Sequence, residues 1–252
     1  MFRPDPDIIS ANESRATRIA VVAIAVPALL IGLIALVVAP WWLALILAVL
    51  VAAFMWWRAS SAESKLLTAV GAKPADPKRH ARLVNLADGL AVQAGVRVPE
   101  LMVVESDVAN AMAVGRDERS AAVVVTSGLL DRLGRVELEG VLAQLFAELR
   151  SGDVELRTAT YAHGAPLAAA AQGLYAKLID RAVDPDRRFR NDAAGVAITR
   201  FPPGLVAAYE ALDGHAGAPG PTAAAHLWMI APVPQSPSHP ATATRIAALR
   251  EL

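Results

Sequence analysis

The sequence predicts an α+β protein, in which an N-terminal two-helix transmembrane hairpin precedes a mostly helical domain with a small β-sheet. Three observations predict this class. Residues 19–57 contain no charged side chain. Short runs rich in branched residues, which are typical of strands, follow later in the chain. Most of the remaining sequence has apolar residues at the spacing of amphipathic helices. The expected parts are an N-terminal segment (1–18), the hairpin (19–57), a juxtamembrane linker (58–82) and the domain (83–252).

The uncharged stretch is too long for one membrane span and has about the length of two, since a helix needs roughly 20 residues to cross a bilayer. Pro40 divides it into Ile19–Ala39 and Trp41–Trp57. Because only Ala39 and Pro40 link the pieces, we expect a tight hairpin, with a kink at Pro27 in the first helix. Paired tryptophans at both ends of the second piece are typical of an aromatic belt at the membrane interfaces.

Positive charges lie on both flanks of the hairpin and none lies in its short loop. The positive-inside rule therefore predicts a multi-pass protein of the cell membrane, with the N-terminus and the large domain in the cytoplasm. A signal peptide fits less well, because the apolar stretch is too long and begins too late. A buried hairpin of a soluble protein is the other alternative. The flanking basic residues are Arg3, Arg15, Arg18, Arg58, Lys65 and Lys73.

Composition excludes several classes of function. Hydrophobic residues make up 55% of the chain, and their excess is concentrated in the hairpin rather than spread over the fold. The formal net charge is zero, without the basic stripe that nucleic-acid binding requires, so no nucleic-acid partner is expected. The chain has no cysteine, which excludes disulfides, iron–sulfur clusters and cysteine-based zinc sites, and which suits a cytoplasmic domain.

The domain is predicted to begin with a helix, continue with a small sheet, and end in further helices. Gly95 is expected to cap the first helix. A turn at Arg116–Ser120 is expected to separate two strands. The expected helices are Leu83–Ala94, Val136–Arg150, Ala165–Ile179, Pro203–Leu212 and Thr242–Leu252; the expected strands are Leu101–Val104, Asn110–Gly115 and Ala121–Val125; and Asp213–Ala225 is expected to be a flexible loop.

Five short motifs occur in a recognisable order within this domain. Asn110–Gly115 has the pattern N-A-x-A-x-G, a helix then contains Val141-Leu142-Ala143, and Gly152-Asp153-Val154 follows it. Residues 187–194 read R-R-F-R-N-D-A-A, and His239-Pro240 precedes Arg245-Ile246. Together, behind a membrane hairpin, these motifs resemble those of the HtpX-type membrane zinc metallopeptidases, from about residue 83 to the end.

This resemblance implies a metallopeptidase-type domain, a setting in protein quality control and a definite site. In that family an H-E-x-x-H helix supplies two histidine ligands to zinc and a glutamate general base, and a later glutamate is the third ligand. The family's edge strand pairs with an extended peptide. The resemblance places that substrate-binding strand at Asn110, Ala111, Met112 and Ala113, and it gives Asp153 and Asp192 supporting structural roles.

The chain departs from the family at every position that carries the chemistry. The two histidines correspond to Gln144 and Glu148, the general base to Leu145, and the third ligand to Arg188. A hydrocarbon side chain cannot accept a proton from water, and a guanidinium cannot bind zinc because it stays protonated. We therefore expect no catalytic residue, no metal and no cofactor, although zinc serves the active family members. A site rebuilt from other histidines remains the alternative; the candidates are His163, His215, His226 and His239.

Two further expectations follow from the departures. The exchange of a histidine for Glu148 and of a carboxylate for Arg188 suggests an ion pair across the former metal site, and the alternative is that both side chains point into solvent. Members of the family often carry a second hydrophobic pair between the two metal-binding helices. Here Ala165–Ile179 is too short and too polar to span a membrane, so a single hairpin is expected, with this helix packed on the domain or lying at the membrane surface.

Three functions are compatible with these residues. The first is a pseudopeptidase that lies in the lipid bilayer and binds a polypeptide, or a paralogous membrane protease, without hydrolysis. The second is an active metalloendopeptidase with unusual zinc ligands. The third is a structural subunit of a membrane complex, in which the old groove is closed; whether the strand at Asn110–Gly115 stays open to a peptide distinguishes it from the first.

Overall fold

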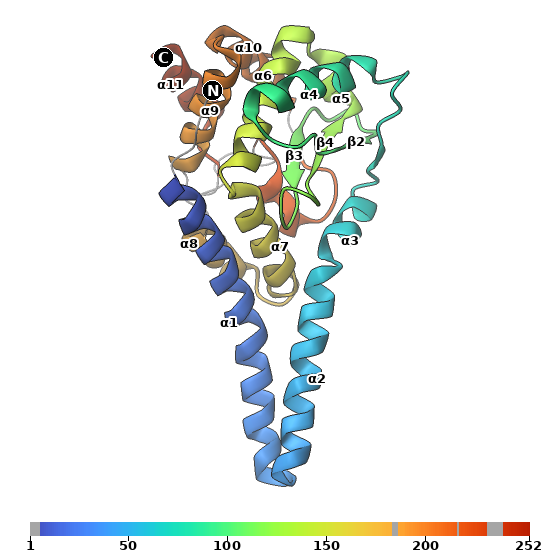
Figure 1. Ribbon diagram of the computed structural model, residues 1–252, viewed down its shortest axis with the longest axis vertical. Coiled ribbons are helices and arrows are strands. Elements are labelled where there is room, and N and C mark those ends of the chain that lie inside the picture. The colour runs from blue at the N-terminus through green and yellow to red at the C-terminus, as the bar shows by residue number, and fades with distance from the viewer. Residues whose placement is uncertain (1–5, 183–185, 216, 231–238) are drawn as a thin grey trace.

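Two long apolar helices form the N-terminal hairpin, as the sequence predicts. The computed structural model describes residues 6–182, 186–215, 217–230 and 239–252. Helix α1 spans Pro6–Val38 and α2 spans Trp41–Ser60, and each is long and apolar enough to cross a membrane. Only Ala39 and Pro40 connect them. The helices meet at this turn and diverge toward the domain (Figure 1).

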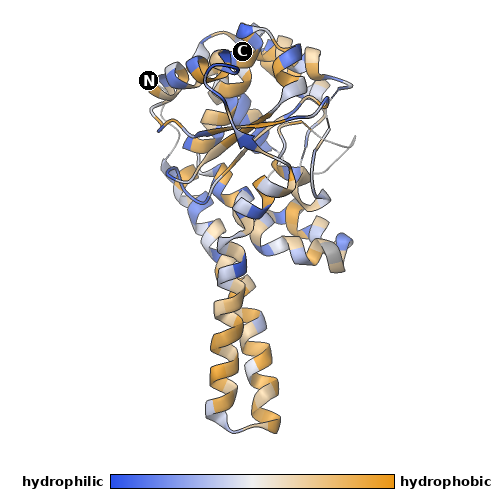
Figure 2. Cartoon of the chain, turned by 90° about the vertical axis from the view of Figure 1, so that its right-hand side faces the viewer, coloured by the Kyte–Doolittle hydropathy of each residue, from blue (hydrophilic) through white to orange (hydrophobic). Residues whose placement is uncertain are grey.

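Small residues hold the two helices together. A Cβ added at Gly32 of α1 would lie 3.1 Å from the Cβ of Ala48 on α2. Ala28, Ala35 and Ala44 are buried in the same contact, whereas most large apolar side chains of both helices point outward. Close approach through small residues is typical of helix pairs in lipid, where outward apolar groups are already well solvated. The hairpin is correspondingly the most uniformly hydrophobic part of the chain (Figure 2).

The first turns of α1 belong structurally to the domain. Helix α1 is continuous through Pro27. Its buried Asn12 donates to the carbonyl of Ser151 at 2.9 Å and to Oδ1 of Asp153 at 2.8 Å. The residues before the apolar stretch are therefore helical and pack where α6 (Arg135–Arg150) meets α7 (Asp153–Ala170). The N-terminal end of α1 lies beside the domain (Figure 1).

A four-stranded mixed sheet with the order β1-β2-β4-β3 lies inside the domain. The strands are β1 (Lys73–Pro74), β2 (Glu100–Val104), β3 (Ala111–Val114) and β4 (Ala122–Thr126). Strands β2 and β4 are parallel, and β3 pairs with β4 antiparallel, with Met112 opposite Val124. The short strand β1 was not expected. It pairs with β2, so part of the predicted linker 58–82 packs as sheet against the domain.

The sheet separates two apolar clusters, because alternate side chains of each strand point to opposite faces. Val103, Val123 and Val125 face the main core. Four helices complete this core: α4 (Ala81–Ala94), α6, α9 (Asp186–Thr199) and α10 (Pro202–Leu212). Met102, Met112 and Val124 face a second cluster, formed with α3 (Ala62–Ala69), α7 and the segment that ends at Trp228. Trp228 is the largest fully buried side chain of the described residues.

Most predicted helices are confirmed to within a few residues, and Gly95 caps α4 in the left-handed region at φ 68°. The remaining helices are α3 (Ala62–Ala69), α4 (Ala81–Ala94), α5 (Ser127–Arg132), α6 (Arg135–Arg150), α7 (Asp153–Ala170), α8 (Gln172–Ala182), α9 (Asp186–Thr199), α10 (Pro202–Leu212), the 3₁₀ helix η1 (Thr222–Leu227) and α11 (Thr242–Arg250).

Two expectations about elements were wrong. Ala165–Ile179 is not one helix but the end of α7 and most of α8, separated at Ala171 (φ −152°). The break lets Tyr175 pack against Gly164 and donate from its hydroxyl to the carbonyl of Ala223 at 2.6 Å. The predicted loop at 213–225 is also only partly irregular, because its last residues begin η1.

Candidate functional site: a degenerate metallopeptidase centre

Helix α6 presents the residues at the former metal and base positions, and all of them are buried. Gln144, Leu145 and Glu148 lie on one continuous buried stretch of the helix. Helix α9 crosses α6 at very close range, since a Cβ added at Gly195 would lie 2.7 Å from the Cα of Gln144. This contact brings the next functional helix directly over Gln144 and explains why a glycine is needed at that position.

Leu145 belongs to the main apolar core, with no exposed surface. Its neighbours in this cluster include Leu142 and Phe146 of the same helix. The position that corresponds to the general base therefore contributes packing, and it offers neither a proton acceptor nor a polar contact for a water molecule.

Glu148 forms an ion pair with Arg157 of α7. Its Oε2 contacts Nη2 of Arg157, and Nε2 of Gln144 donates to Oε1 at 2.9 Å. Burial alone would raise the pKa of Glu148, but the charges of Arg157, Arg188 and Arg187 outweigh burial and hold this pKa below its usual value. The carboxylate is therefore charged at neutral pH and engaged on both oxygens.

The hypothesis of a Glu148–Arg188 ion pair was wrong about the partner. Nη2 of Arg188 donates to the carbonyls of His226 (3.1 Å) and Trp228 (2.9 Å), and Nη1 donates to that of Met229 (3.0 Å). Nη2 also lies 2.7 Å from Nε2 of His239. Arg188 is thus hydrogen-bonded to backbone carbonyls at the end of η1 and just after it. Its positive charge also lowers the pKa of Glu148. Burial and the neighbouring arginines lower the pKa of Arg188, and Glu148 acts in the opposite direction.

The predicted peptide-binding strand is β3, which lies at one edge of the sheet, and part of the same chain covers that edge. Met112 forms an antiparallel bridge with Trp228, and the amide of Met229 donates to the carbonyl of Ala111 at 2.7 Å. Asn110 donates to the carbonyl of Ile230 at 3.0 Å and accepts from its amide at 3.1 Å. Peptide binding along Asn110–Ala113 remains a prediction, and in this conformation residues 228–230 hold the place that a peptide would take.

The two aspartates predicted to be structural lie in separate buried networks. Asp153 accepts from Asn12 and from Asn191, and so connects α1, α7 and α9. Asp192 accepts from Nε and Nη2 of Arg245 at 2.8 and 2.6 Å, and from the hydroxyl of Tyr209 at 2.7 Å. These contacts join α9, α10 and α11.

The residues at this centre do not fit a zinc ion. A guanidinium contacts the carboxylate that would be a ligand, and a second guanidinium stands at the third-ligand position. Among the described residues no three His, Asp or Glu side chains are placed to hold a metal. His226 is held between the carbonyls of Ala223 and Arg157, and burial lowers its pKa to about 3, so it is neutral. His163 lies elsewhere, in the cavity between the hairpin and α7.

Arg157 and Trp228 are the functional positions that sequence reasoning missed. The only signal for Arg157 was a lone arginine among small and apolar residues on α7. The sequence around Trp228 does not predict a strand, because its isolated bridge to Met112 requires no alternation of apolar and polar residues. The four arginines near the centre (Arg157, Arg187, Arg188 and Arg245) are all buried.

Comparison with known proteins agrees with the motifs. A model of Peptidase family M48 matches residues 77–183. A protease HtpX homolog of Tropheryma whipplei (strain Twist) is 29% identical over 221 residues, which cover 72% of this chain and 76% of that protein. A protease HtpX homolog of Caldanaerobacter subterraneus subsp. tengcongensis is 37% identical over 112 residues, 44% of this chain and 38% of that protein. No solved structure matches the chain.

The matched region, the helix order and the small sheet define a metallopeptidase-type domain attached to a membrane hairpin. Within that class, the chain is similar to the protease HtpX homologs, and its residues 77–183 match Peptidase family M48.

Proposed function

We propose that this protein is a membrane-anchored pseudopeptidase, which binds a polypeptide or a paralogous protease without hydrolysing it. One observation carries the proposal: the buried Glu148–Arg157 ion pair lies where a histidine ligand and its metal would be expected. A guanidinium supplies positive charge to the site, as the metal would, but it has no vacant position at which to polarise a water molecule. The ion pair therefore supports a structural role for the centre.

The other replaced positions point in the same direction. Peptide hydrolysis needs an activated water and a group that moves its proton. Leu145 provides no such group, and Gln144 uses its amide to hold Glu148. The competing hypothesis is an active metalloendopeptidase with unusual zinc ligands, and this hypothesis requires a bound metal ion.

The orientation in the membrane is part of the proposal. The N-terminal turns of α1 pack on the domain, so both lie on the same side of the bilayer. The basic residues that flank the hairpin favour the cytoplasmic side. A C-terminal reporter enzyme that is active only outside the cytoplasm is expected to stay silent; activity of that reporter would reverse the orientation.

A structural role without peptide binding is the second candidate, and the covered β3 edge favours it. The side chains of Met112 and Trp228 are both fully buried. A partner peptide could pair with β3 only after residues 228–230 leave it.

One experiment on the full-length protein in detergent distinguishes these functions. We expect substoichiometric zinc by elemental analysis and no cleavage of an unfolded protein substrate, while an HtpX homolog prepared in the same way contains zinc and cleaves. One equivalent of zinc together with chelator-sensitive cleavage would establish the active peptidase instead.

A second experiment, cross-linking with photo-methionine incorporated in living cells, tests whether the β3 edge is open to a peptide. Capture of a polypeptide at Met112 supports the pseudopeptidase, and cross-links from Met112 only to the Trp228 region support the structural subunit.

A further inference from the structure

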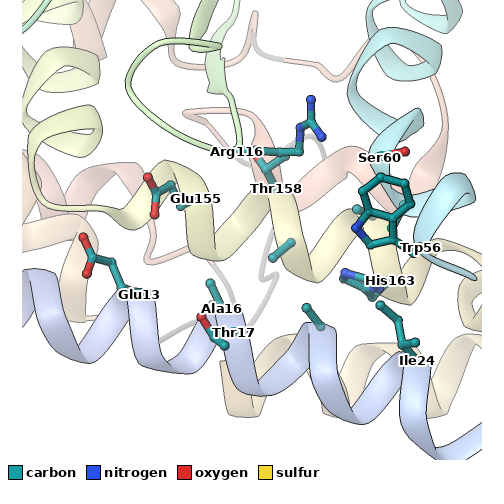
Figure 3. A pocket seen from close by; sticks show the side chains of 14 residues that line it. Glu13, Ala16, Thr17, Ile24, Trp56, Ser60, Arg116, Glu155, Thr158 and His163 are labelled. Atoms are coloured by element: carbon teal, nitrogen blue, oxygen red, sulfur yellow. The ribbon is translucent and has the colours of Figure 1, made fainter. Parts of the chain in front are cut away.

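A cavity of about 480 Å³ lies where the hairpin meets the domain. Helices α1, α2 and α7 form its walls, and Arg116, in the turn between β3 and β4, lies at its upper side (Figure 3). Helix α7 enters between α1 and α2 at the level where they diverge (Figure 1). The cavity is separate from the degenerate centre, since none of Glu148, Arg157 and Arg188 lines it.

The lining changes from apolar to charged along α1. Ala20 and Ile24 lie within the uncharged stretch of the hairpin, as does Trp56 on the opposite wall. Glu13 lies on the domain side of that stretch, eleven residues before Ile24, which is about 16 Å along the helix. One end of the cavity is therefore at the depth of lipid chains and the other at the depth of lipid headgroups.

Two carboxylates lie at the charged end, one on α1 and one on α7. Glu13 and Glu155 both line the cavity (Figure 3), and neither forms an ion pair within the part of the chain that the structure describes. Burial, then the negative charges of Glu13 and Asp117, raise the pKa of Glu155. A cation between the two carboxylates would relieve this repulsion.

The remaining polar groups of the cavity complement a phosphate. Arg116 is half-exposed and pairs only loosely with Glu63, at 3.7 Å. The hydroxyl of Thr17 also lines the cavity, whereas that of Ser60 donates to the carbonyl of Trp57 at 2.8 Å. Burial and the charge of Arg58 lower the pKa of His163, so its ring is neutral at pH 7 and adds no charge. The charged end thus combines a site for an ammonium with a single site for an anion.

We propose that this cavity binds one aminophospholipid of the leaflet next to the domain, with its ammonium between Glu13 and Glu155, its phosphate near Arg116, and an acyl chain along Ile24 and Trp56. The surrounding membrane supplies an amphiphile of this kind. A primary ammonium donates three hydrogen bonds, and it can serve both carboxylates at once. A choline headgroup has no N–H donor, and a lipid with net negative charge is repelled by the two carboxylates.

The test measures lipid retention by the intact protein. The purified protein is equilibrated with mixed micelles that contain equal amounts of phosphatidylethanolamine, phosphatidylcholine and phosphatidylglycerol, and bound lipids are quantified by mass spectrometry after gel filtration. We expect a preference for phosphatidylethanolamine over phosphatidylcholine of about tenfold, the factor that corresponds to one charge-assisted hydrogen bond. The double variant Glu13→Gln/Glu155→Gln is expected to lose this preference.

A matched control removes two carboxylates at other exposed positions, as Asp131→Asn/Glu251→Gln, and should keep the preference. Equal retention of the ethanolamine and choline lipids by the wild-type protein would overturn the proposal without any variant. A preference for phosphatidylglycerol, or a preference that the Glu13/Glu155 variant retains, would overturn it as well. Because the carboxylates are not part of the core, the thermal unfolding midpoint of both double variants in detergent should match that of the wild-type protein.

Discussion

Replacing Arg157 with leucine is expected to lower the free energy of unfolding by about 3–5 kcal/mol, the usual cost of leaving one partner of a buried ion pair alone. Arg157 and Glu148 are both almost completely buried. Arg157 also donates to the carbonyl of Leu227 at 3.0 Å, so the substitution frees a carboxylate and a carbonyl together. Denaturant titration of the full chain in detergent micelles, followed by tryptophan fluorescence, measures the loss.

The same substitution should reverse the acid response at Glu148. In the wild-type protein the folded-state pKa of Glu148 is depressed. Its contribution to stability is therefore complete above the unfolded-state pKa of about 4.3 and is lost as the pH falls through the lower folded-state pKa. Removing Arg157 takes away the largest of the charges that oppose burial, so we expect the folded-state pKa of Glu148 to rise. The variant is then expected to gain stability relative to the wild-type protein as the pH falls from 7 toward 5.

Two further variants show whether the charge pair itself is responsible. The double variant Glu148→Leu/Arg157→Met should recover most of the lost stability, since replacing both partners removes the unpaired charge. Arg79→Leu breaks the exposed pair with Glu105, whose side chains are 67% and 54% exposed, and should change stability by less than about 1 kcal/mol. If Arg157→Leu costs no more than Arg79→Leu, Glu148 and Arg157 are not a buried ion pair.

Replacing Arg245 with methionine is the second substitution with a large expected effect, again about 3–5 kcal/mol. The guanidinium makes two hydrogen bonds to Asp192 and one to the carbonyl of Met229 at 2.9 Å. It also stacks on Tyr209, with its central carbon 4.4 Å from the ring centroid. Its loss leaves the buried carboxyl group of Asp192 without its guanidinium partner, and it removes one of the two arginines that hold residues 228–230 against β3.

The neighbouring Arg250 is a matched control on the same helix. It pairs with Glu210 at the surface, where the two side chains are 64% and 49% exposed, so Arg250→Met should cost less than about 1 kcal/mol. Limited proteolysis provides a second readout: Arg245→Met should speed cleavage around residues 228–230, whereas Arg250→Met should not. Equal effects of the two substitutions on stability and on cleavage would contradict the assigned role of Arg245.

Local patterns in the sequence determined most of the secondary structure. The uncharged stretch predicted both hairpin helices, and Gly95 predicted the end of α4, because span length and helix capping depend on neighbouring residues alone. The strands β2, β3 and β4 followed from short runs of branched residues and small turns. The break at Ala171 was missed, because it depends on the packing of Tyr175 against Gly164, which no local pattern contains.

The sequence by itself also determined that Leu145 cannot act as a base and that Arg188 cannot bind a metal, since these are properties of the side chains wherever they lie. Only the tertiary structure decided what replaced the metal. The left-handed Gly152 (φ 72°) ends α6 and turns the chain back, so that Arg157 reaches Glu148. Closure of the β3 edge was likewise a tertiary matter, because Trp228 meets Met112 across more than a hundred residues of chain. Pairing of this kind depends on where whole helices cross, and the order of residues along each helix does not contain that information.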